Sequence, residues 1–108
     1  MSHKTFVSHL ECSYTGEVYE ADRVHGLSRE GKPLLVRYDL AALGAELDRE
    51  ALSARSGGLW KYLELLPVRS QENIISLGEE LTPLVELPKL QAGPGRLLVK
   101  DEGRLPTG

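Results

Sequence analysis

Cysteine is scarce in this 108-residue sequence, since Cys12 is the only one and cannot form an internal disulfide. A single thiol fits a reducing cytoplasm. No apolar run approaches the roughly 18 residues of a membrane span, and the N-terminus lacks the apolar core of a secretory signal. Charges of both signs are interspersed at a formal net charge of −3, without a basic patch. We therefore expect a cytoplasmic protein that binds neither membrane nor nucleic acid.

Glycine and proline are abundant, with 11 and 6 residues, so turns and connections must occupy much of the chain. The hydrophobic fraction of 41% and the charged fraction of 27% are those of a folded protein rather than a disordered one. The length allows one domain or part of one.

Residues 5–38 have the pattern of short strands joined by tight turns. Gly16 and Gly31 can take the positive φ that such turns require, and Pro33 cannot continue a ladder inward. Residues 34–38, with β-branched and aromatic character, predict a partly buried strand. The first zone, residues 1–39, is thus predicted to be a small β-rich unit.

Helical periodicity follows. Asp39 can cap a helix whose apolar stripe is Leu40, Leu43 and Leu47, and Asp48 can begin a second, short helix. A third stripe, Leu59, Tyr62, Leu63 and Leu66, predicts a helix that Pro67 ends.

Beyond residue 68 the pattern favours extended segments near 74–75, 84–85 and 97–99, with turns at Gly78 and at Gly93–Gly95. Strand 97–100 would lie in a larger α/β sheet, where ligands bind beyond the carboxyl ends of the strands. Residues 40–108 therefore form a second predicted zone, a helical arm leading into strands.

Candidate metal ligands are few. Cys12–Gly16 has the form of a zinc knuckle, C-x-x-C-G, with Thr15 in place of the second cysteine. Structural zinc needs four ligands, and no second pair follows, so we predict no metal site even with His9 and His25 in the region. His3, His9 and His25 have no neighbouring nucleophile to activate, and none is predicted to be catalytic.

The remaining candidates also favour structural roles. Asp101 and Glu102, as neighbours on a strand, would point to opposite faces and could not share a reacting atom. Gly93-x-Gly95 lacks the third glycine of a dinucleotide loop and indicates a turn. Trp60 is expected at a helix surface or in the core.

Several segments, in chain order, resemble threonine synthase, a pyridoxal-phosphate enzyme of the tryptophan-synthase-β class. They are Leu10–Ser13 with Gly16, Glu17 and Tyr19; Gly31–Leu40; Trp60–Tyr62 with Leu65–Val68; Ile75–Glu79 with Thr82–Leu84; and Val99–Gly103 with Pro106–Gly108. The third is similar to W-[RK]-Y-x-x-L-L-P, the fourth to S-L-G-E-G-x-T-P-L, and the last to K-x-E-G-x-N-P-T-G. The ordered set covers nearly the whole chain from residue 10.

Three departures from the family pattern stand out. Thr15 removes a knuckle cysteine, Glu80 replaces a glycine, and Arg104-Leu105 replaces the common L-N before P-T-G. The change at Leu105 removes an amide that could hydrogen-bond in the pocket.

The resemblance implies an α+β fragment: a degenerate zinc-ribbon-like unit, a helical arm, and the opening strands of a fold-type II α/β domain. It implies a lyase of threonine biosynthesis that converts O-phospho-L-homoserine and water to L-threonine and phosphate with pyridoxal phosphate. The Schiff-base lysine, in the family's S-F-K, is expected beyond Gly108, and Lys100 is rejected as its substitute because the family fills that strand position anyway.

We therefore predict no catalytic, cofactor-binding or metal-binding residue in this chain, and no cofactor or activity for the chain alone. Glu102, Thr107 and Gly108 are predicted to lie next to the pocket of the parent enzyme, whose partner is a small-molecule substrate. Self-association through strand 97–100 is also expected. Two alternatives stay open: a related enzyme such as cysteate synthase, and a free-standing interaction module that uses the stripe Leu59–Leu66 and strand 97–100.

Overall fold

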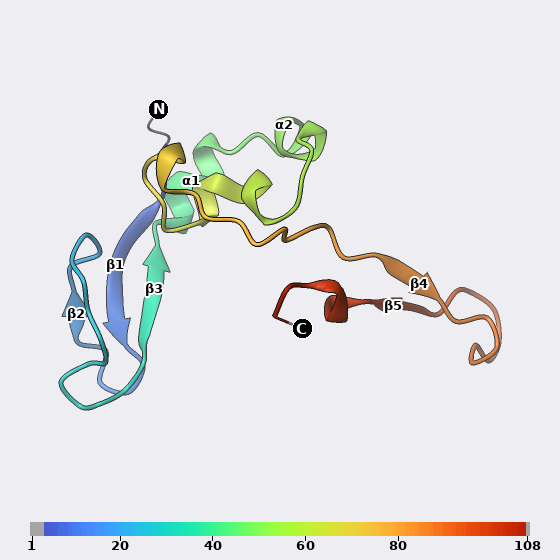
Figure 1. The fold of residues 1–108 in the computed structure, drawn as a ribbon, viewed down its shortest axis with the longest axis horizontal. Helices are drawn as coiled ribbons and strands as arrows, with labels where there is room; N and C mark the ends of the chain where they lie inside the picture. The colour runs from blue at the N-terminus through green and yellow to red at the C-terminus, as the bar shows by residue number, and fades with distance from the viewer. Residues whose placement is uncertain (1–3, 108) are drawn as a thin grey trace. The chain divides into compact units, whose positions relative to one another are not determined.

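The computed structural model describes residues 4–107 and shows an α+β chain (Figure 1). It divides into two compact units. The first runs up to Arg55 and includes Tyr62–Ile74, and the second consists of Ser56–Lys61 with the residues from Ile75 on. The predicted boundary at residue 39 is not where these units divide, because the two α-helices lie in the same unit as the N-terminal sheet.

The first unit contains a three-stranded antiparallel sheet of order β2-β1-β3. Its strands are β1 (Val7–Cys12), β2 (Val18–Tyr19) and β3 (Leu34–Tyr38), and the β1–β3 ladder runs from Cys12↔Leu34 to Val7↔Tyr38. The two predicted turns are confirmed, since Gly16 has a φ of 76° and Gly31 a φ of 67°. Both values lie in the region that favours glycine.

Two short α-helices follow the sheet, α1 (Leu40–Glu46) and α2 (Arg49–Ala54), and both begin where predicted. The Asp39 carboxylate accepts from Ala42 N at 2.9 Å, and Asp48 accepts from Glu50 N at 3.0 Å. The predicted stripe on α1 is wrong at its first position. Leu43 is 7% exposed but Leu40 is 66% exposed, so the unit covers only part of the stripe.

The third predicted helix is a kinked 3₁₀ segment rather than an α-helix, η1 (Leu59–Leu65), with Tyr62 at φ −100° and ψ 37°. Its hydrogen bonds join residues three apart, as in Leu66 N to Leu63 O at 3.1 Å. None of its side chains is fully buried. The backbone at Ile74 is extended as predicted, with φ −70° and ψ 123° after a single 3₁₀ turn, η2 (Gln71–Asn73), but the segment near 74–75 forms no strand.

The second unit contains a two-stranded antiparallel hairpin, β4 (Leu84–Glu86) with β5 (Leu98–Lys100), and a final turn, η3 (Glu102–Arg104). Gly78, Gly93 and Gly95 have positive φ, which confirms the predicted turns. Gly58 packs directly on the next loop, because a Cβ there would collide with the Glu79 carbonyl oxygen. Between residues 4 and 107, no helix is long and apolar enough to cross a membrane.

Candidate functional site

Cys12 lies where the two glycine turns of the first unit meet. Its side chain is 1% exposed, and Sγ lies 3.1 Å from the Ser28 hydroxyl. Thr15 N donates to Sγ at 3.5 Å, and Lys32 N donates to Ser28 Oγ at 3.2 Å. Ser28 was not predicted from the sequence. The signal for it was the second glycine turn, because Ser28 stands three residues before Gly31 much as Cys12 stands four before Gly16.

Hydrogen bonds control the acidity of this thiol. The Ser28 hydroxyl, followed by Thr15, lowers the pKa of Cys12 from 9.0 to about 7, while burial acts in the opposite direction. With its sulfur almost fully covered, Cys12 has the acidity of a reactive thiol without the access that reaction requires. The contact therefore joins two turns and does not present a nucleophile.

The two described histidines do not converge on Cys12. His9 Nδ1 lies 2.8 Å from Ser8 Oγ, and its Nε2 lies 3.7 Å from a Glu11 carboxylate oxygen. His25 Nε2 lies 2.7 Å from the Glu20 carbonyl oxygen. No group of three or more His, Cys, Asp or Glu side chains that could hold a metal ion occurs within residues 4–107. The absence of bound zinc stays a prediction, and His3 lies outside the described residues.

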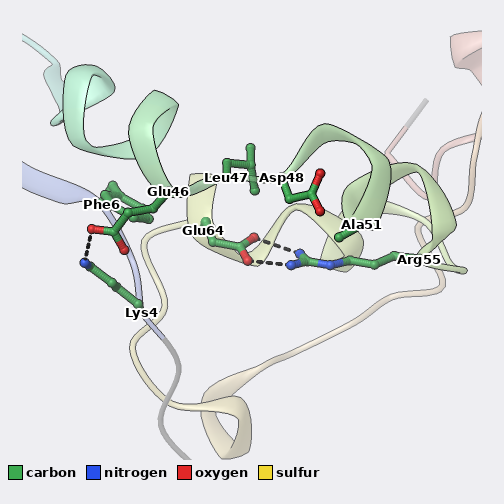
Figure 2. A pocket seen from close by; sticks show the side chains of 8 residues that line it. All are labelled: Lys4, Phe6, Glu46, Leu47, Asp48, Ala51, Arg55 and Glu64. Atoms are coloured by element: carbon green, nitrogen blue, oxygen red, sulfur yellow. Dashed lines mark hydrogen bonds and ion pairs between the residues drawn. The ribbon is translucent and has the colours of Figure 1, made fainter.

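A cavity of about 240 Å³ opens between the residues that precede β1, the stretch from the end of α1 to Arg55, and Glu64 (Figure 2). Its lining residues are Lys4, Phe6, Glu46, Leu47, Asp48, Ala51, Arg55 and Glu64. Arg55 forms a two-bonded ion pair with Glu64 at 2.8 and 2.6 Å, which raises the pKa of Arg55, and Lys4 pairs with Glu46 at 2.5 Å. Each of these ion pairs joins two segments of the unit beside the pocket (Figure 2).

In the second unit, two of the motif segments are in contact. Glu102 accepts a hydrogen bond from the Thr82 hydroxyl at 2.7 Å, and Lys100 Nζ donates to the Thr82 carbonyl oxygen at 3.1 Å. The Asp101 carboxylate accepts from Gly103 N at 3.1 Å. The prediction that Asp101 and Glu102 alternate on a strand is wrong, because β5 ends at Lys100 and Asp101 caps η3. The two carboxylates still bind different partners.

Thr107 and Gly108 are the other residues predicted to lie next to the pocket. Thr107 is exposed, and Gly108 lies outside the described residues. Glu79 folds back on its own loop, where the hydroxyl of Ser76 and the amide of Leu77 lower the pKa of its carboxyl. Glu80, which replaces the family's glycine, is exposed.

The surroundings of Lys100 do not fit a pyridoxal-phosphate site. Lys100, the lysine of the last motif segment, donates to Thr82 O and lies 3.7 Å from a Glu102 oxygen, exposed on the hairpin. No step of a cofactor-dependent reaction can be assigned to residues 4–107. What the fold and contacts define is a small α+β segment whose polar side chains connect its own loops and strands.

The sequence is similar to threonine synthases over nearly its whole length, as the motifs predicted. It is 36% identical to the threonine synthase of Methanocaldococcus jannaschii over 99 residues, 90% of this chain and 24% of that protein. It is 35% identical to the threonine synthase of Methanosarcina acetivorans over 103 residues, again 24% of the relative. The chain spans about a quarter of the length of these curated relatives. No family profile and no solved structure matches it.

Proposed function

We propose that this chain is the N-terminal part of a threonine synthase, a cytoplasmic lyase that converts O-phospho-L-homoserine and water to L-threonine and phosphate. The observation that supports this most is the similarity to two threonine synthases over at least nine-tenths of the chain. It is reinforced by the motifs, which occur in family order from residue 10 to the C-terminus. Pyridoxal phosphate would serve the parent enzyme as electron sink.

The part played by this segment is structural. In the family pattern the last motif, Val99–Gly103 with Pro106–Gly108, leads into the Schiff-base lysine. The Thr82–Glu102 hydrogen bond and the Lys100 contact tie the start of β4 to the turn after β5, so they fix the direction in which residues 103–107 leave the hairpin. We propose that Glu102, Thr107 and Gly108 border the substrate pocket of the complete enzyme, and that the 108-residue chain alone is inactive.

The experiment compares the 108-residue chain with the protein translated from the reading frame that continues past codon 108. Both are incubated with pyridoxal phosphate and O-phospho-L-homoserine, and the release of phosphate and threonine is measured. We expect turnover by the longer protein only, and we expect borohydride to fix the cofactor onto a lysine of the longer protein only. Threonine formation by the 108-residue chain would refute the assignment of the chemistry to later residues, and an inactive, cofactor-free longer protein would refute the proposed function.

A further inference from the structure

The β4–β5 hairpin has one face made only of aliphatic side chains. Val85 pairs with Val99, and Leu87 N donates to Leu97 O at 3.0 Å. Because side chains alternate across a strand, Val85, Leu87, Leu97 and Val99 lie on one side, called here the hairpin face. The opposite side is mixed, since Glu86, paired with Arg96, and Lys100, bonded to Thr82, lie there beside Leu84 and Leu98.

Within the second unit, three of the four side chains of the hairpin face are exposed, and Leu87 is half-buried. Val85 and Leu97 are each 41% exposed and Val99 is 46% exposed. In the part of the second unit that the structure describes, residues 56–61 and 75–107, no side chain is buried. A two-stranded hairpin is at best marginally stable in water and gains stability by packing its apolar face on another layer. The unit therefore lacks the layer that this face requires.

We infer that the hairpin face is a docking surface for the remaining three-quarters of a threonine synthase polypeptide, and that an apolar layer of that later region covers it. The inference rests on the proposed function. The length of the curated relatives supports it, because this chain matches only 24% of each of them. An occupant on the same polypeptide also loses no translational freedom of association when it packs, so a small face suffices.

A second copy of the chain fits the face poorly. Four aliphatic side chains offer an area on the order of a few hundred Å². A stable interface between separate proteins buries about 800 Å² on each partner. The hairpin face also contains no aromatic or arginine side chain of the kind that anchors such interfaces.

Two matched substitutions on β5 test the docking surface. Val99→Lys places a charge on the hairpin face, and Leu98→Lys places the same charge at the neighbouring position on the mixed side, where the starting side chain is 37% exposed. Each is made in the 108-residue chain and in the protein translated past codon 108, and thermal unfolding and sedimentation are measured for all four proteins.

We expect Val99→Lys to lower the unfolding midpoint of the longer protein by about 5 °C or more, and Leu98→Lys to change it by less than about 2 °C. In the 108-residue chain, where both positions are open to water, the two variants should behave alike. Equal effects in the longer protein would overturn the docking surface even if that protein makes threonine. If the longer protein is inactive and Val99→Lys alone lowers its unfolding midpoint, the result would support the docking surface and reject the proposed function. Dimers of the 108-residue chain that Val99→Lys abolishes would assign the face to a second copy and overturn the inference.

Discussion

Replacing Leu43 by alanine tests how the first unit is held together. The side chain is 7% exposed, and the other large apolar side chain buried in the described part of this unit is Phe6, at 6%. Removing a buried leucine side chain costs about 2–5 kcal/mol, from lost transfer energy and the cavity that remains. Small domains have roughly 5–15 kcal/mol of total stability, so this single change should remove a large part of it.

The same helix supplies the control. Leu40 lies one turn earlier on α1 and is 66% exposed, so Leu40→Ala should change the free energy of unfolding by about 0.5 kcal/mol or less. Urea unfolding followed by far-ultraviolet circular dichroism measures both variants. With a slope of about 1 kcal/mol per molar urea, Leu43→Ala should lower the midpoint by about 2 M or more, or leave the unit unfolded without urea. Equal midpoints for the two variants would refute the assignment of Leu43 to the core.

Three further predictions concern single sites. Folding lowers the pKa of Cys12 from 9.0 to about 7, so the folded state binds fewer protons between these values and the free energy of unfolding should rise from pH 7 to pH 9. That gain is lost as the pH falls through 7. In urea titrations, Cys12→Ser should flatten the dependence of the free energy of unfolding on pH. A thiolate absorbance that appears only near pH 9 would show that burial outweighs the hydrogen bonds in setting the pKa of Cys12. Gly44→Ala, inside α1 with open space at its Cβ, should stabilise the chain by about 0.5–1 kcal/mol, and a destabilised variant would contradict this. Because Thr15 cannot replace a thiolate, elemental analysis should find no zinc, whereas about one zinc per chain lost with Cys12→Ser would contradict the prediction.

Local rules predicted much of the fold. The glycine turns at Gly16 and Gly31 and the helix starts at Asp39 and Asp48 depend on a few adjacent residues, so the sequence contains the information for them. The 3₁₀ form of η1 and the exposure of Leu40 depend on what each segment packs against. An apolar stripe specifies a face, but neither the hydrogen-bond pattern of the helix nor whether a partner covers that face. The helix type of η1 and the burial of Leu40 were therefore mispredicted.

In the candidate site, too, some features can be predicted from adjacent residues and others depend on how distant segments pack. The absence of a second C-x-x-C pair could be seen in the sequence, but the contact between Cys12 and Ser28 joins residues 16 apart and becomes evident only when the two turns are folded. Similarly, Asp101 was predicted on a strand because the apolar run 97–99 continues toward it, whereas its carboxylate caps η3. A side chain that can accept from the backbone competes with strand continuation, and here the cap forms instead.

The central claim is that this chain is the N-terminal part of a threonine synthase, and the most direct test is to sequence the gene or transcript beyond codon 108. The account predicts an open frame that continues directly with Ser-Phe-Lys and extends for about three times the length of this chain, as the 24% coverage of its relatives implies. A stop codon directly after Gly108, or a continuation without that lysine, would contradict it.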